Sequence, residues 1–183
     1  GDLADVATVI ALTDRQKKAR GGITAFAVEK GTPGFSVGTI EKKMGLRGSH
    51  TCELIFDDCR VPVASVIGGE PMIGQGFKTA MRVLDKGRLT MGACALGGAQ
   101  KLLDMSVAYS KERVQFGKPI STFQSVQNML ADMATEIYAA RQMLYHAACL
   151  RDQGKQVVRE ASMVKLFCTE MACRVADRAV QIF

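Results

Sequence analysis

Residues 123–147 read FQSVQNMLADMATEIYAARQMLYHA, and the spacing of their apolar side chains decides the fold class. Apolar residues recur in alternating steps of three and four, which is the repeat of an amphipathic α-helix with one buried face. The repeat comprises Phe123, Val126, Leu130, Met133, Ile137, Ala140, Leu144 and Ala147. Ser121 or Thr122 can cap the start of this helix, and Gly154 can end it.

The same repeat continues on both sides of this stretch. Upstream, no proline interrupts the chain between Phe77 and Tyr109, and apolar residues recur there at helical spacing. Downstream, a third helix is predicted from the apolar series Val157, Ala161, Val164, Cys168, Met171, Val175, Ala179 and Ile182. Three long helices with short links predict an up-and-down bundle in which neighbouring helices are antiparallel.

Residues 1–72 show a different pattern. Short runs of apolar and β-branched residues are separated by turn signals such as Gly31-Thr32-Pro33-Gly34, which is typical of strands. The four predicted strands are 6–12, 23–28, 35–40 and 51–56. The predicted fold class is therefore α+β. A small antiparallel β-sandwich or barrel in residues 1–72 is followed by an up-down α-helical bundle in residues 73–183.

The composition is that of an ordinary globular protein, and it restricts the binding partners. Of the 183 residues, 48% are hydrophobic and 23% are charged, and no apolar run reaches the length of a membrane-spanning helix. The net charge of +6 favours an anionic partner such as a phosphorylated cofactor. Nucleic acid is disfavoured because only 6% of the residues are aromatic, tryptophan is absent and the basic residues are dispersed.

The six cysteines contain no C-x-x-C pair, so no metal site is predicted. Cys94, Cys149 and Cys168 lie in apolar helical stretches, and we expect them to be small core residues. Cysteine usage of this kind favours a reducing compartment.

The first predicted helix is rich in small residues. They are Gly87, Gly92, Ala93, Ala95, Gly97, Gly98 and Ala99. Each glycine costs about 1 kcal/mol of helix propensity relative to alanine. The close approach of another helix or of a ligand would offset that cost, and tight helix packing is the simpler explanation.

Four stretches in order along the chain resemble the acyl-CoA dehydrogenase family. They are residues 43–49 (KMGLRGS) with 54–62 (LIFDDCRVP), 74–78 (GQGFK) with 84–88 (LDKGR), 111–120 (KERVQFGKPI) with 123–124 and 130–133, and 179–183 (AVQIF). The resemblance covers the whole chain and is strongest to the short-chain, butyryl-type members. It implies that residues 1–72 are part of the middle β-domain and that residues 73–183 are part of the C-terminal helical domain.

The resemblance also implies a reaction. Members of this family use FAD to oxidise an acyl-CoA thioester to the trans-2-enoyl-CoA, removing a proton from the α-carbon and a hydride from the β-carbon. An electron-transferring flavoprotein usually accepts the electrons, and the enzymes are usually homotetramers of the bacterial cytoplasm or mitochondrial matrix. The alternatives are a sibling acyl-CoA oxidase or flavin monooxygenase, or a non-catalytic helical assembly module.

By resemblance, six residues contact FAD. They are Arg113, Gln115, Phe116, Phe123, Gln124 and Gln181. A guanidinium such as that of Arg113 suits a pyrophosphate, because its planar fork makes two charge-assisted hydrogen bonds. Alternatively, Arg113 is a solvated cation at a helix end, Gln124 forms a capping box with Ser121, and Gln181 is an ordinary surface residue.

By the same resemblance, Asp85, Lys86, Gly87 and Arg88 lie beside the acyl-CoA substrate. The alternative is a surface ion pair between Asp85 and Arg88, which are three residues apart on a helix. Gly87 occupies the position where one branch of the family carries its catalytic glutamate, so that branch is disfavoured. In the other branch the glutamate would follow Phe183. We therefore expect a fragment of a longer enzyme that lacks the catalytic base.

Overall fold

The structure is a computed structural model that describes residues 1–183 and divides into two compact units. The first unit, Gly1–Met81, is built mainly from short strands, and the second, Arg82–Phe183, from three helices. The division falls inside helix α1 (Gly76–Glu112), which contributes to both units. The predicted α+β fold class is confirmed.

The first unit contains two antiparallel pairs of strands. Strand β1 (Val6–Leu12) pairs with β2 (Ile23–Glu29), and β3 (Phe35–Ile40) pairs with β4 (Cys52–Phe56). The four predicted strands are therefore confirmed to within a residue or two. The two pairs are separate two-stranded sheets, so the barrel that the sequence allowed does not close. The connection to α1 contains two short 3-10 helices, η1 (Val63–Ser65) and η2 (Glu70–Met72).

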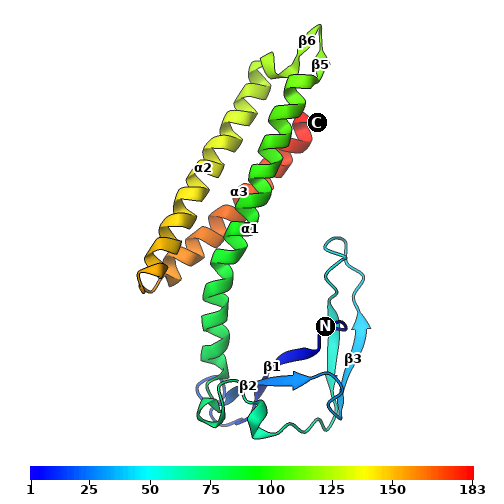
Figure 1. Cartoon of the computed structure of the whole chain (residues 1–183), viewed down its shortest axis with the longest axis vertical. Helices are drawn as coiled ribbons and strands as arrows, with labels where there is room; N and C mark the ends of the chain where they lie inside the picture. Colours follow the sequence, from blue (N-terminus) through cyan, green and yellow to red (C-terminus); the bar gives the residue numbers. More distant parts are fainter. The chain divides into compact units, whose positions relative to one another are not determined.

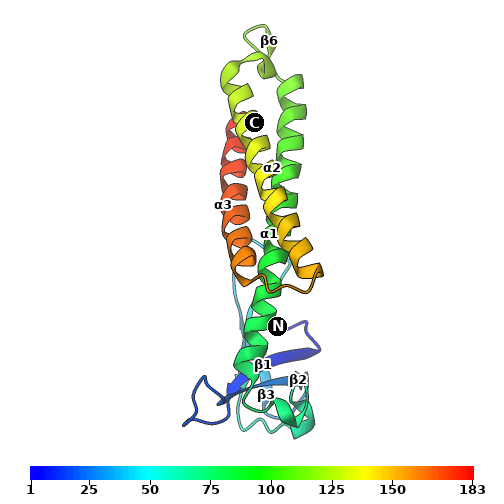
Figure 2. The same ribbon diagram turned by 90° about the vertical axis from the view of Figure 1, so that its left-hand side faces the viewer.

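The second unit is a three-helix bundle. The Arg82–Glu112 part of α1 lies beside α2 (Gln124–Asp152) and α3 (Val158–Ile182), and successive helices run in opposite directions (Figures 1 and 2). On α3 the predicted apolar series from Ala161 to Ile182 is buried throughout. On α2 the series is buried from Met133 onward and half-buried before it. The helical period therefore identified the core faces of both helices.

Helix α1 approaches α3 closely at one glycine. A Cβ at Gly92 would lie 2.7 Å from Cγ1 of Val164, so a larger residue cannot fit without movement. Gly97 and Gly98, in contrast, are exposed, and a Cβ on either would meet nothing within 4 Å. Packing within the chain thus explains the glycine at position 92 but not those at positions 97 and 98.

The two ends of α2 differ from one another in how well the sequence predicted them. The predicted cap by Ser121 or Thr122 is wrong, because Phe123 is the N-cap residue and no side chain caps the helix. Residues Ile120–Thr122 form a 3-10 turn instead, and the Thr122 hydroxyl donates to the Pro119 carbonyl at 2.8 Å. At the other end Gly154 (φ 76°) closes the helix as predicted, with its N–H donating to the Arg151 carbonyl.

The cysteine prediction is only partly correct. Cys168 is fully buried, and its burial raises the pKa of the thiol. Cys94 and Cys149 are exposed, so their assignment to the core is wrong. Both lie among apolar residues along the chain but on the outer faces of their helices.

Candidate functional site

A small hairpin joins α1 to α2 at one end of the bundle, which we call the hairpin end. Strand β5 (Val114–Gln115) pairs with β6 (Lys118–Pro119), and the Ile120 N–H donates to the Arg113 carbonyl at 2.9 Å. The two residues of the turn, Phe116 and Gly117, have φ angles of 52° and 79°. Positive φ at both positions is the pattern of a type I′ turn, which pairs strands of native twist.

Phe116 is an unfavourable residue for its position in this turn. Positive φ is uncommon for any residue with a side chain, and type I′ turns favour asparagine or glycine. The Phe116 ring is also 92% exposed, with only an edge-on contact to Phe123 at 6.2 Å between centroids. Local strain combined with an exposed aromatic ring is typical of a functional position rather than a structural one.

Three polar side chains at the hairpin end are free to bind a ligand. Arg113, Gln115 and Gln124 are exposed, and none makes a side-chain hydrogen bond or ion pair within the chain. The capping box between Ser121 and Gln124 is not formed, because α2 has no side-chain cap. Phe123 is half-buried, and the Lys118 ammonium lies 4.6 Å from the centre of its ring.

Gln181 lies at this same end, although it is far away in sequence. The ring of Phe183, two residues further on, stacks on Tyr109 of α1 with 4.5 Å between centroids. The Tyr109 carbonyl in turn accepts a hydrogen bond from the Arg113 N–H at 2.8 Å. The structure therefore brings all six cofactor candidates to the hairpin end of the bundle. Figure 1 shows the C-terminal end of the chain beside α1 in this part of the bundle.

The chemistry of this set suits a ligand that carries both negative charge and an aromatic ring. Arg113 offers a guanidinium without an acidic partner, and Phe116 offers an exposed ring face. Gln115, Gln124 and Gln181 offer amides, each of which has donors and an acceptor. A dinucleotide cofactor fits this donor set.

The substrate candidates lie near the opposite end of the bundle. Arg88 and Asp85 form an ion pair within α1, and both side chains are about one-third exposed. An open depression of about 500 Å³ adjoins them, lined by Arg82, Asp85, Lys86, Arg151, Lys155, Gln156, Val157 and Val158. A Cβ added at Gly87 would meet nothing within 4 Å, so there is space beside this residue. At 1.5 Å per residue, roughly 35–40 Å of α1 separate Arg88 from Arg113.

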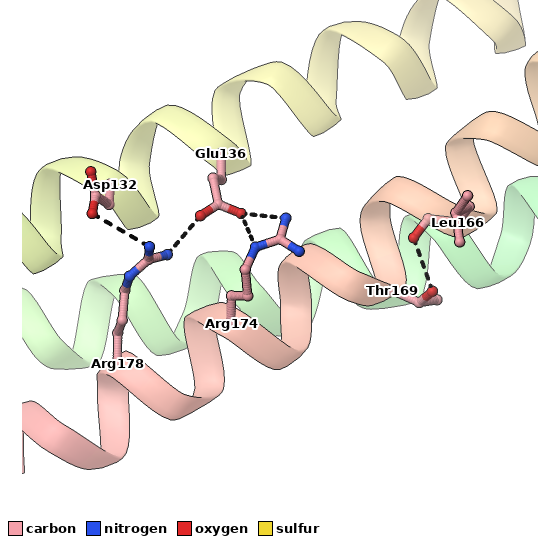
Figure 3. Close-up of polar contacts among 6 residues, drawn as sticks. All are labelled: Asp132, Glu136, Leu166, Thr169, Arg174 and Arg178. Carbon is pink, nitrogen blue, oxygen red and sulfur yellow. Dashed lines mark hydrogen bonds and ion pairs between the residues drawn. The ribbon is translucent and has the colours of Figure 1, made fainter.

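An ion-pair cluster that the sequence analysis missed joins α2 to α3 (Figure 3). The Glu136 carboxylate accepts hydrogen bonds from Arg174 Nε at 2.7 Å and from Arg178 Nη1 at 2.6 Å. Arg178 also donates to Asp132 at 3.4 Å. Each helix contributes like charges four residues apart, and this pattern on two antiparallel helices was the signal available in the sequence.

Glu136 is held in its ionised form by this cluster. Its side chain is only 21% exposed, and this burial alone would raise its pKa. The hydrogen bonds and positive charges of Arg174 and Arg178 outweigh burial and lower the pKa of Glu136 below its usual value.

The lowered pKa predicts how stability depends on pH. Because the folded-state pKa of Glu136 lies below the unfolded value of about 4.3, its stabilisation is fully present above that value. It is lost as the pH falls through the folded-state pKa. Urea unfolding at a series of pH values should therefore show Glu136→Gln less stable than the parent above about pH 5. The difference should shrink as the pH falls, and a constant difference would contradict the ion-pair origin.

No group of three or more histidine, cysteine, aspartate or glutamate side chains comes together to hold a metal ion. None of the helices combines the length and apolar character that crossing a bilayer requires.

Comparison with known proteins agrees with this architecture. Residues 74–183 match the family model of the acyl-CoA dehydrogenase C-terminal domain, and residues 1–59 match that of the acyl-CoA dehydrogenase middle domain. The chain is 50% identical over 182 residues to the acryloyl-CoA reductase (NADH) of Anaerotignum propionicum, covering 100% of this chain and 45% of that protein.

Two solved structures are similar over the full chain. Butyryl-CoA dehydrogenase from Megasphaera elsdenii superimposes with a TM-score of 0.93 at 48% identity, covering 100% of this chain and 47% of that one. PigA with FAD and proline superimposes with a TM-score of 0.90 at 35% identity, covering 100% of this chain and 46% of that one. The chain thus spans about half the length of the proteins it matches.

Proposed function

Because the chain belongs to the acyl-CoA dehydrogenase family, we propose that this protein is a FAD-dependent enzyme that oxidises short acyl-CoA thioesters to trans-2-enoyl-CoA. The observation that carries the proposal is the unpartnered donor set at the hairpin end. A guanidinium and three amides lie at that end without a side-chain hydrogen bond or ion pair, together with a strained and exposed aromatic ring whose single contact is edge-on to Phe123. The similarity to butyryl-CoA dehydrogenase favours a short acyl chain.

At the hairpin end, the residues of this chain would bind and orient the cofactor. Arg113 would neutralise the pyrophosphate, and Phe116 and Phe123 would offer ring surfaces to the cofactor. Gln115, Gln124 and Gln181 would hydrogen-bond to its polar edges. When bound, FAD would accept the hydride, which no side chain of the protein can do.

At the other end of the bundle, the acyl-CoA substrate would lie beside Asp85, Lys86, Gly87 and Arg88. The ion pair with Arg88 fixes the Asp85 carboxylate, and the missing side chain at Gly87 leaves room for the ligand. The separation of roughly 35–40 Å along α1 keeps this group away from the hairpin end of the same chain. As the resemblance to the family implies, we propose that the hairpin end of one subunit completes the flavin site of another, in a homotetramer.

The remaining assignments extend the same proposal. An electron-transferring flavoprotein would accept the electrons, and residues 1–72 and 73–183 would be parts of the middle and C-terminal domains. The bacterial origin of the named relatives favours the bacterial cytoplasm over the mitochondrial matrix.

A second candidate is the reverse reaction, the reduction of a short 2-enoyl-CoA. It is favoured by the 50% identity to an acryloyl-CoA reductase. The two directions use the same binding groups and differ in the redox partner that supplies or removes the electrons.

Visible absorbance and turnover test the proposal together. The whole enzyme that carries this chain, purified as the holoprotein, should show a flavin absorption band and should reduce an electron-accepting dye in the presence of butyryl-CoA. Rapid reoxidation by oxygen would indicate an oxidase or monooxygenase instead, and turnover only of acryloyl-CoA with reduced flavin would indicate the reductase. Protein that stays colourless after incubation with FAD would overturn the proposal and leave the assembly module.

A further inference from the structure

We propose that Glu136 is a positioning residue for the cofactor, because its ion pairs to Arg174 and Arg178 set the rotation of the last turns of α3 and thereby the direction of Gln181. The inference rests on the proposed function, since it requires FAD at the hairpin end. It assigns a role to an ion-pair cluster that makes no hydrogen bond to the cofactor candidates or to the substrate candidates.

The first argument is the alignment of three side chains on α3. Arg174, Arg178 and Gln181 stand at positions i, i+4 and i+7, which lie along one edge of an α-helix. Arg174 and Gln181 are only about 20° apart around the helix axis. Any rotation of α3 that moved the arginines away from Glu136 would turn Gln181 by the same angle.

The second argument is the position of the ion pairs along the contact between α2 and α3. Helices α2 and α3 are antiparallel, so Arg174 lies opposite Glu136 and Arg178 lies between Glu136 and Asp132 (Figure 3). The next step along this seam, towards the hairpin end, reaches Gln181 on α3. The cluster is therefore the last polar contact between α2 and α3 before the proposed cofactor site.

The third argument is that the ion pairs specify a direction that the most adaptable buried side chains between α2 and α3 do not. The largest fully buried side chains there are Met133 and Met171, and methionine adapts its shape to small shifts. Ala140 and Ala179 each have only a methyl group as a side chain, which constrains the rotation of a helix little. A carboxylate that accepts hydrogen bonds from two guanidinium groups, in contrast, has a defined direction.

Gln181 itself has no other contact that would direct it. It is exposed and makes no side-chain hydrogen bond, so its orientation follows from the helix that carries it. The stacking of Phe183 on Tyr109 holds the helix end near α1 but does not touch the amide.

A double-mutant cycle on FAD affinity in the holoprotein tests this role. The variants are Glu136→Gln, Gln181→Ala and the two combined, and the FAD dissociation constant is measured by flavin fluorescence. Each single variant should weaken binding roughly threefold to tenfold, the size of one hydrogen bond. If Glu136 acts through Gln181, the combined variant should bind FAD no more weakly than Gln181→Ala.

Asp177→Asn is the matched control, because Asp177 is exposed on α3, forms no ion pair and undergoes the same change from a carboxylate to an amide. It should leave FAD affinity unchanged. Circular dichroism should show equal helicity in all variants. If Glu136→Gln does not fold, Arg174→Gln, which removes only one of the two pairs, takes its place in the cycle.

Two results would overturn the inference while leaving the proposed function intact. Effects that multiply in the combined variant would show that Glu136 acts independently of Gln181. Unchanged affinity in Gln181→Ala would show that there is no contact to position. Failure of the parent protein to bind FAD would instead overturn the proposed function.

Discussion

Replacing Gly92 with valine should lower the free energy of unfolding by about 3 kcal/mol, because the new side chain overpacks the contact between α1 and α3. The added Cβ alone would lie 2.7 Å from Cγ1 of Val164, and its two methyl groups would need further space. Val164 is only 1% exposed, and a short β-branched side chain cannot swing away. Urea unfolding monitored by circular dichroism measures the loss.

Two other glycines of α1 provide the control for this prediction. Gly97→Ala and Gly98→Ala should each raise the free energy of unfolding by about 0.5–1 kcal/mol, because alanine favours helix and a Cβ there meets nothing. The combined variant Gly92→Ala with Val164→Ala should lose less free energy of unfolding than Gly92→Val does. If Gly92→Val were as stable as the parent, α1 and α3 would not approach each other as closely as described.

Replacing Arg113 with glutamine should weaken FAD binding by about 10- to 100-fold, the value of a charge-assisted hydrogen bond to a phosphate. Arg113 is exposed and forms no ion pair, so its removal should leave the free energy of unfolding nearly unchanged. Titration with FAD at two salt concentrations measures the effect. The affinity of the parent should fall more steeply with salt than that of the variant.

Lys111→Gln is the control for Arg113. It removes the same charge two residues earlier, from an exposed side chain without an ion pair at the end of α1. Its effect on FAD affinity should be less than about threefold, as expected for a screened surface charge. Equal losses in both variants would mean that only the net charge of the hairpin end matters, and Arg113 would then have no specific contact.

The sequence predicted the elements whose pattern is local. The apolar series on α3 was buried from Ala161 to Ile182, because a helix places residues three and four apart on one face whatever surrounds it. The end of α2 at Gly154 was equally local, since the turn requires a positive φ that glycine adopts readily. The apolar neighbours of Cys94 and Cys149 in sequence predict burial, but the helical turn directs both side chains outward.

The cap of α2 shows a competition that the sequence alone did not decide. Thr122 is a good capping residue, yet it lies in a 3-10 turn in which its hydroxyl donates to Pro119. Because the 3-10 turn occupies Ile120–Thr122, the N-cap position of α2 falls on Phe123. Local hydrogen bonding of a threonine side chain thus replaced its capping role.

The sequence by itself determined the strands, the three helices, the buried faces of α2 and α3 and the resemblance to a family, because each depends on residues close together in the chain. Only the tertiary structure decided that Gly92 and not Gly97 is a close contact, and that Glu136 binds Arg174 and Arg178. It also decided that Gln181 lies at the hairpin end with Arg113. These contacts join residues about 40 to 70 positions apart, as in the contacts of Glu136 with Arg174 and of Tyr109 with Phe183. Helical period fixes which face of a helix is buried, but not which residue of another helix meets it.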